Sequence, residues 1–177
     1  GTDFIIDTSF PSPTADPGDL AWDGSHLWLA AHTSSYDTIY EITTAGAVVS
    51  KINSPTVLPY GLTYDGSHLW VSVTSWPHGI YEITTAGAIA SGPLSGHGSQ
   101  ESMGLGWQGA NRLWEVVAGA SGHDSAYVTN VSSWSSPVGG FLLPRDWQEG
   151  CAYDDVHDLL WVCSWDAADP RIYGLNP

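Results

Sequence analysis

Short runs of alternating hydrophobic and polar residues recur along the chain and predict β-strands throughout. In the segment Leu20-Ala-Trp-Asp-Gly-Ser-His-Leu-Trp28, two β-prone runs flank an Asp-Gly turn, which is a strong signal for a β-hairpin. The segment returns 42 residues later as Leu62-Thr-Tyr-Asp-Gly-Ser-His-Leu-Trp70, and looser copies cover 105–114 and 151–161. The chain is therefore a repeat protein with a period of forty-odd residues.

A third β-prone run with a central tyrosine follows each hairpin, at 38–42, 79–83, 125–129 and 171–175. A fourth run follows in three of the copies, at 47–52, 88–91 and 138–142. Four antiparallel strands at this period are typical of propeller blades. We therefore predict an all-β, four-bladed β-propeller with four antiparallel strands per blade, forming one domain over 1–177. The predicted blades cover 18–53, 60–92, 103–143 and 149–177.

The last strand of the fourth blade is missing at the end of the chain, which stops at Pro177. The first ten residues form a β-prone run with no hairpin of its own. We predict that residues 1–10 supply the closing strand of blade four, because pairing there would remove an exposed sheet edge. The pattern leaves open whether this strand closes its own chain or is exchanged between chains.

Residues that every repeat requires are assigned to packing. One tryptophan occupies the same strand position in each copy, and we expect these side chains to pack between blades. They are Trp28, Trp70, Trp114 and Trp161. Asp23 and Asp65 stand before the turn glycine, and Gln108 takes their place in the third copy. An amide that replaces a carboxylate indicates turn chemistry rather than catalysis.

The blade pattern resembles that of known propellers. Trp22-Asp-Gly-Ser-His-Leu-Trp28, Ile39-Tyr-Glu-Ile42 and Thr44-Ala-Gly-Ala-Val48 are similar to the blade motifs of bacterial secreted NHL, YVTN and streptogramin-lyase-like propellers. The resemblance covers nearly the whole chain and implies the fold, but it implies no particular activity. Such families have five to seven blades, so four repeats imply a compact four-bladed ring or half of an eight-bladed dimer.

Charge and cysteine content indicate which partners and which cellular location to expect. Nineteen acidic residues against four basic ones give a net charge of −15, which disfavours nucleic acids and anionic membranes as partners. No apolar run approaches the roughly 20 residues of a membrane span, so we expect no membrane insertion. An acidic, lysine-poor chain favours a secreted, extracellular protein. Cys151 and Cys163 flank one predicted hairpin, and in that setting we predict a disulfide between them.

Subtracting the repeat leaves candidates for function. Four tryptophans have no counterpart in the other blades; Trp134 is one, and the remaining three fall in loops on one face of the disc. Three histidines fall in loops on the same face. The candidate ligand-binding residues are therefore Trp76, Trp147, Trp165, His32, His78 and His123.

Other polar clusters are weaker candidates. Asp154, Asp155 and Asp158 crowd one turn and could favour calcium, but they lack the regular spacing of a calcium loop, so we expect no metal. Asn130-Val-Ser132 is a sequon for N-glycosylation. The chain contains no P-loop, dinucleotide fingerprint or nucleophile elbow, so we expect no cofactor and assign no catalytic residue.

Three functions remain open. We favour a non-catalytic extracellular module for structure, assembly or surface adhesion, such as a subunit of a fibre or surface layer. The second is a glycan-binding lectin that uses the unpaired tryptophans. The third is a lyase- or lactonase-like enzyme with a histidine site on the loop face. The expected partner is accordingly a protein, including a second copy or a neighbouring module, or a glycan.

Overall fold

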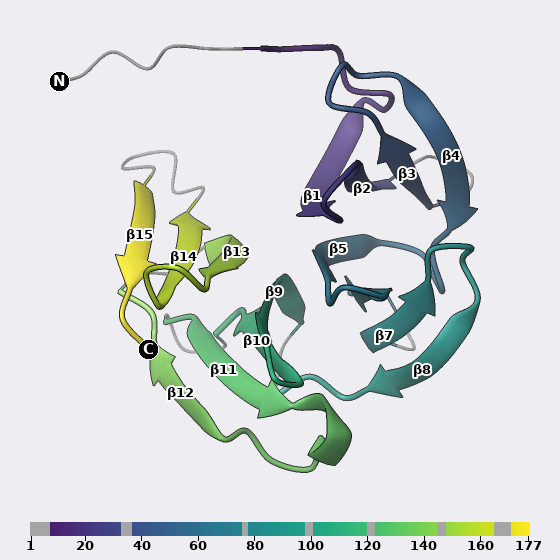
Figure 1. Ribbon diagram of the computed structural model, residues 1–177. Coiled ribbons are helices and arrows are strands. Elements are labelled where there is room, and N and C mark those ends of the chain that lie inside the picture. The colour runs from purple at the N-terminus through teal and green to yellow at the C-terminus, as the bar shows by residue number, and fades with distance from the viewer. Residues whose placement is uncertain are drawn as a thin grey trace, which may run out of the picture.

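The computed structural model is an arc of four antiparallel sheets arranged around a common axis (Figure 1). It describes residues 8–32, 37–75, 78–97, 101–119, 123–144, 148–164 and 171–177, with only the backbone described at 32, 148 and 149. Each sheet corresponds to one predicted repeat, so the all-β, four-bladed β-propeller is confirmed. Within these ranges no helix has the length and hydrophobicity needed to cross a membrane.

The first three blades have four strands each. Blade 1 consists of β1 (Asp16–Trp22), β2 (Leu27–His32), β3 (Thr38–Ile42) and β4 (Val48–Asn53). Blade 2 consists of β5 (Pro59–Tyr64), β6 (His68–Val73), β7 (Gly79–Thr84) and β8 (Ile89–Leu94). Blade 3 consists of β9 (Ser102–Gly109), β10 (Arg112–Val117), β11 (Ser125–Asn130), a 3-10 turn at Val131–Ser133, and β12 (Gly139–Leu142).

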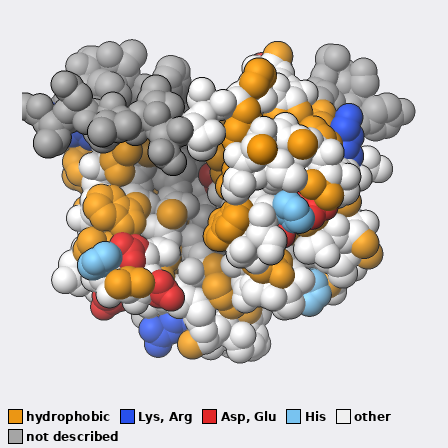
Figure 2. All heavy atoms as spheres, turned by 45° about the horizontal axis from the view of Figure 1, so that its top comes forward, with side chains coloured by type: hydrophobic (Ala, Val, Ile, Leu, Met, Phe, Trp, Pro, Cys, Tyr) orange, Lys and Arg blue, Asp and Glu red, His pale blue; other side chains and the backbone are white. Residues whose placement is uncertain are grey.

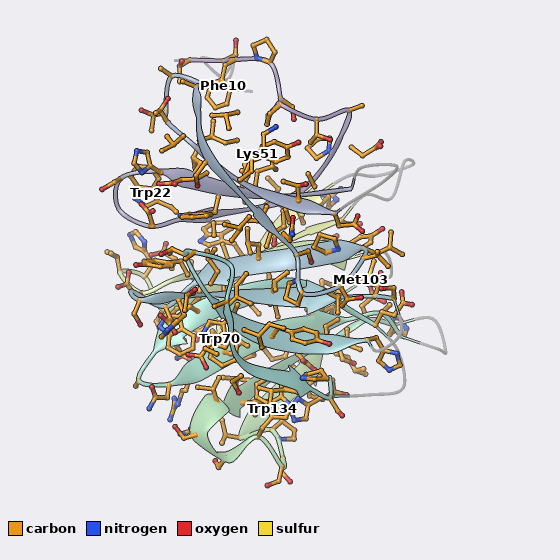
Figure 3. All side chains as sticks on the ribbon, turned by 90° about the vertical axis from the view of Figure 1, so that its right-hand side faces the viewer. Phe10, Trp22, Lys51, Trp70, Met103 and Trp134 are labelled. Carbon is orange, nitrogen blue, oxygen red and sulfur yellow. The ribbon has the colours of Figure 1, made fainter. Side chains whose placement is uncertain are left out.

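Blade 4 has three strands in the described part of the chain: β13 (Gln148–Asp154), β14 (Leu159–Ser164) and β15 (Arg171–Leu175). The closing strand was expected over residues 1–10, of which 1–7 lie outside the described residues. Residues 8–10 form no strand. Phe10 instead packs on Leu29, Tyr40 and Ile42 of blade 1, on the side away from blade 2 (Figure 3). Closure of blade 4 by the preceding residues stays a prediction.

A large residue opposite a small one fixes the inner hairpin of every blade. Trp28 pairs with Ala21, and Trp70 pairs with Thr63. The same register pairs Trp114 with Gly106 and Trp161 with Ala152. The small residues leave room on the inner strand, so each indole projects from the sheet toward its neighbour.

In the first three blades, the repeat tryptophan packs on the following blade. We call the face that carries it the trailing face, and the opposite one the leading face. Trp70 stacks on Trp107 of blade 3, with ring centroids 6.0 Å apart and planes 15° from parallel. Trp28 packs in one cluster with Leu62 and Tyr64 of blade 2. Trp114 packs in another cluster with buried residues of blade 4. The hydrophobic core is therefore a series of interfaces between blades, each of which buries a trailing face against a leading face.

The predicted disulfide is not formed. Cys151 and Cys163 are both free thiols, the first buried and the second exposed. Cys151 lies opposite Val162 on β14, while Cys163 lies opposite Gly150 on β13. Successive residues of a strand point to opposite faces, so this offset of one residue puts the two thiols on different sides of the blade.

Interface packing predicts unequal roles for equivalent tryptophans. Trp70 is 3% exposed, whereas Trp161 is 40% exposed at the same register position. We expect Trp70→Ala to lower the free energy of unfolding by about 3–5 kcal/mol and Trp161→Ala by about 1–2 kcal/mol, because only the first removes a fully packed indole. Chemical denaturation of dilute protein measures both. Equal losses would show that blade 4 is packed as tightly as blade 2.

Candidate functional site

The trailing face of blade 4 is uncovered. Ile172 is 74% exposed, whereas its counterparts Ile39, Ile80 and Ala126 are completely buried. Cys163 is exposed, whereas the residues at its position in the other blades are buried: Ala30, Ser72 and Val116. Among the described residues, no other blade packs on these side chains. A surface that is interior in three blades is therefore at the outside in the fourth.

The leading face of blade 1 is uncovered near the axis. Leu20 is 54% exposed and Trp22 is 50% exposed. Their counterparts in blade 2, Leu62 and Tyr64, are covered by the trailing face of blade 1. The outer part of the leading face differs, because Phe10 lies over it. The bare region is thus the inner part, next to the axis.

A cleft separates the two uncovered faces. Figure 2 shows it as a hollow with hydrophobic side chains on both sides. A cavity of about 270 Å³ at its base is lined by residues of all four blades: Pro17, Gly18, Asp19, Tyr60, Met103, Gly150 and Cys163. A second cavity, of about 220 Å³, extends outward along blade 4 past Trp161 and Ile172. This cleft is the candidate functional site.

Asp19 is the charged residue in the cleft lining. It stands on β1 where the other blades have Gly61, Gly104 and Gly150. One carboxylate oxygen accepts a hydrogen bond from Leu62 N at 2.9 Å, and the other accepts one from Leu20 N at 2.9 Å. Burial raises the pKa of Asp19 to about 7, although both backbone bonds act to lower it. Asp19 on blade 1 therefore links that blade to blade 2 through its hydrogen bond with Leu62 N.

Glu115 is a second acid that departs from the repeat. It occupies the position of Leu29, Val71 and Val162, and it is buried. Its carboxylate accepts hydrogen bonds from the backbone N–H of His97 and from the Ser102 hydroxyl, and the His97 ring lies 3.3 Å away. The pair holds the segment before blade 3 against that blade. Sequence reasoning missed both acids, although comparison of register positions could have found them.

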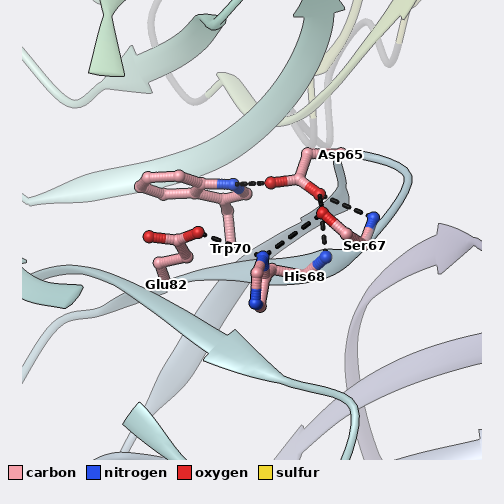
Figure 4. Close-up of polar contacts among 5 residues, drawn as sticks. All are labelled: Asp65, Ser67, His68, Trp70 and Glu82. Atoms are coloured by element: carbon pink, nitrogen blue, oxygen red, sulfur yellow. Dashed lines mark hydrogen bonds and ion pairs between the residues drawn. The ribbon is translucent and has the colours of Figure 1, made fainter. Parts of the chain in front are cut away.

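The Asp-Gly turns carry a shared network, drawn for blade 2 in Figure 4. Asp65 accepts hydrogen bonds from the backbone N–H groups of Ser67 and His68 and from the indole of Trp70. His68 Nδ1 lies 3.1 Å from Glu82. Blade 1 repeats the arrangement. In blade 3 the side-chain oxygen of Gln108 accepts the hydrogen bond from the Trp114 indole instead. The interpretation of this position as turn chemistry is confirmed.

Among the described residues, these turn networks are also the groups of three side chains whose atoms lie close enough to hold a metal ion. One ligand atom each from Asp23, His26 and Glu41 lies within 4.8 Å of the others, as in the matching trio of blade 2. Hydrogen bonds within the turns account for this proximity. Blade 3 builds the same turn with an amide, so the turn does not depend on a cation.

Of the six histidines and tryptophans predicted on the loop face, the structure describes the side chains of two, so a site there stays a prediction. Trp76, Trp147 and Trp165 lie outside the described residues, as does the side chain of His32. His78 and His123 are exposed just before β7 and β11, and neither belongs to a three-ligand cluster among the described residues.

Trp134 is a loop anchor. Its indole donates to Ser95 O at 2.7 Å and packs on the His97 ring at 5.1 Å. It thereby ties the loop before β12 to the segment that leads into blade 3. These contacts give Trp134 a packing role in its loop.

The acidic turn of blade 4 is used within the chain. Asp154 accepts hydrogen bonds from Val156 N and His157 N and lies 2.7 Å from His157 Nδ1. Asp158 accepts one from the Tyr153 hydroxyl. Within the described residues, Asp154, Asp155 and Asp158 form no three-ligand cluster.

The sequon asparagine lies at the end of β11. Asn130 is half-buried, and its side-chain oxygen accepts a hydrogen bond from Ser132 N at 2.9 Å, which caps the 3-10 turn. Glycosylation there stays a prediction.

Comparisons with known proteins identify the fold. No protein-family model matches the chain, and no curated protein matches its sequence. Among solved structures, a glutaminyl cyclase from Myxococcus xanthus aligns with a TM-score of 0.68 and 13% identity, over 94% of this chain and 68% of that one. The C-terminal WD40 domain of Sif2 aligns with a TM-score of 0.54 and 17% identity, over 90% of this chain and 43% of that one.

The computationally designed Ika4 protein aligns along 99% of both chains, with a TM-score of 0.53 and 10% identity. The chain thus spans less than half of the WD40 structure but nearly all of the designed one. At such identities these similarities show the propeller fold alone.

The position of Asp19 predicts a pH dependence. Its pKa is raised on folding from 3.8 to about 7, so the folded state binds the proton more tightly. The resulting stabilisation is complete below about pH 4 and is lost as the pH rises through 7. Asp19→Asn keeps an acceptor for Leu62 N without the titration. We expect the variant to be more stable at pH 8 by on the order of 2–4 kcal/mol, with little difference at pH 4. Denaturation at several pH values measures both free energies of unfolding. If the two changed in parallel with pH, the prediction would be wrong.

Asp65 predicts the opposite sign and is the matched control. Burial acts to raise the pKa of Asp65, but hydrogen bonds from His68 N, the Trp70 indole and Ser67 outweigh it and lower the pKa. Its stabilisation is present above about pH 4 and is lost as the pH falls through the folded pKa. Asp65→Asn should therefore be less stable than the unmodified protein at pH 7, by about 1 kcal/mol, and should approach it in acid.

Proposed function

We propose that the chain is a non-catalytic extracellular assembly module whose working surface is the cleft between blade 4 and blade 1. It binds another protein by packing a blade-like surface into the cleft, as each blade of the chain packs on the next. The observation that carries the proposal is the exposure of Trp161 and Ile172 at positions that are buried in every other blade.

The chemistry of the two walls supports binding to protein. The exposed side chains on them are hydrophobic or small and uncharged, namely Leu20, Trp22, Ala152, Trp161, Cys163 and Ile172. Contiguous exposed apolar surface in a soluble protein marks an interaction site. The rest of the surface carries a net charge of −15, which keeps the module soluble while the walls stay available.

The free thiols provide the test. Cys163 lies on the uncovered face of blade 4, whereas Cys151 is buried, and burial raises the pKa of Cys151 well above its usual range. In dilute protein we expect a maleimide to modify Cys151→Ala, which keeps only Cys163, at least tenfold faster than Cys163→Ala, which keeps only Cys151. Mass spectrometry follows both rates. If Cys163 resisted modification as strongly as Cys151, the ring would be closed within one chain and the docking surface would not exist.

A further inference from the structure

We propose that the cavity at the base of the cleft binds a protonated amine, with Asp19 as the counter-ion of its ammonium group. The ligand is a primary ammonium on a short alkyl chain. This inference goes beyond the proposed function, because all four blades line the cavity and it needs no protein on the cleft walls. Three features support it: the place of Asp19 in the repeat, the partners of its carboxylate, and the rest of the lining.

The first feature is an acid at a position where the other blades have glycine. The position holds Gly61, Gly104 and Gly150 in blades 2, 3 and 4. A Cβ at Gly61 would lie 2.9 Å from Leu105 N, so glycine lets blade 2 approach blade 3 there. In blade 1, Asp19 accepts a hydrogen bond from the equivalent amide, Leu62 N. Since blade 2 packs on blade 3 without an acid, packing between blades does not require the carboxylate of Asp19.

The second feature is a carboxylate with no cation beside it. Asp19 is half-buried, and its two oxygens accept hydrogen bonds from the backbone N–H groups of Leu20 and Leu62. Among the described residues no ion pair includes Asp19, whereas the buried Glu115 has the His97 ring 3.3 Å away. Burial raises the pKa of Asp19 to about 7, so its ionisation costs free energy in the folded protein. A cation in the cavity would lower this cost.

The third feature is the uncharged lining around the carboxylate. The cavity has a volume of about 270 Å³, and its other lining residues carry no carboxylate, ammonium, guanidinium or imidazole group: Pro17, Gly18, Tyr60, Met103, Gly150 and Cys163. One charged group in an otherwise uncharged cavity is typical of a site for a small organic molecule. Tyr60 brings an aromatic ring and Met103 a flexible thioether, and both suit an alkyl chain next to a cation.

The second cavity has room for the alkyl chain. Asp19, Gly150 and Cys163 line both cavities, so the two adjoin. From Asp19 the second cavity extends past the exposed hydrophobic side chains of Trp161 and Ile172. A ligand with its ammonium group at Asp19 can therefore lay its chain along an apolar surface, and each methylene removed from water adds affinity.

Charge and ligand number argue against other classes of ligand. Nineteen acidic residues against four basic ones give a field that repels anions and concentrates cations in a cleft. A bound metal ion needs several protein ligands, and among the described residues Asp19 belongs to no three-ligand cluster. A single carboxylate is a sufficient partner for an ammonium group. The cavity therefore selects an organic cation.

Isothermal titration calorimetry with n-hexylammonium tests the proposal at pH 8, where Asp19 is mostly ionised. We expect one molecule to bind per chain, with an affinity on the order of millimolar. 1-Hexanol has the same chain without the charge and should bind about tenfold more weakly, because it makes no charge-assisted hydrogen bond. n-Butylammonium has two fewer methylene groups and should bind about four- to sixteenfold more weakly.

Asp19→Asn is the decisive variant, because it removes the charge and keeps an acceptor for Leu62 N. It should weaken the binding of n-hexylammonium about tenfold and leave the binding of 1-hexanol unchanged. Asp155→Asn is the matched control, since it removes the same charge from an exposed acid in the turn of blade 4. This control should bind n-hexylammonium as the unmodified protein does. Circular dichroism checks that both variants are folded.

Cys163 reports where the ligand lies, because it lines both cavities. In Cys151→Ala, n-hexylammonium near saturation should slow the modification of Cys163 by an aromatic disulfide reagent severalfold. The same concentration should have little effect when Asp19→Asn is added to this variant. Slowing that did not depend on Asp19 would place the ligand elsewhere on the cleft and would overturn the proposal.

Two sources carry this ammonium group, namely a free amine and a lysine side chain of another protein. Nα-acetyl-lysine N-methylamide bears the butylammonium chain on a peptide group. Binding as tight as that of n-butylammonium assigns the site to a lysine, whereas much weaker binding assigns it to a free amine. Equal binding of n-hexylammonium and 1-hexanol, or unchanged affinity in Asp19→Asn, would overturn the ammonium site. Neither result alters the reactivity of Cys163 in ligand-free protein, which tests the proposed function separately.

Discussion

The packing of one tryptophan per blade on the next blade is the interaction on which the structure depends. A blade of three or four short strands buries too little surface to be stable alone, so its free energy comes from its neighbours. The trailing indole supplies a large apolar area, and the small residue opposite it on the inner strand lets it reach the next sheet. Its N–H is bonded to the turn residue, Asp65 or Gln108, which fixes its orientation. Turn chemistry and core packing are thus one unit.

The repeat made most of the fold predictable. The hairpins, the tyrosine-bearing third strands and the packing role of Trp28, Trp70 and Trp114 followed from register, because these blades obey the same local rules. The failed prediction concerns an offset of a single residue. Whether Cys151 faces Cys163 or Val162 depends on where the turn at Asp154 starts the pairing, and a shift of one residue exchanges the faces of a strand. Composition and spacing do not resolve so small a difference.

The candidate site could not be found by setting the repeat aside and keeping the loop residues, because its residues belong to the repeat. Trp161 is part of the repeat and was assigned to packing, which is its role wherever a next blade exists. Its exposure follows from its place at the end of the arc, and no local pattern encodes that place. Asp19 and Glu115 escaped notice for a different reason. They sit inside strands, where an acid replaces a residue that the other blades keep as glycine or an aliphatic side chain.

The two ends of the arc pose an energetic problem that the interior does not. Every interior interface hides its apolar faces within the chain, whereas Leu20, Trp22, Trp161 and Ile172 leave theirs in water, and uncovered apolar area costs about 25 cal/mol per Å². A partner that covered these faces would remove the same kind of apolar area from water that the interior interfaces remove. The packing rule that builds the blades therefore also favours a partner at the cleft.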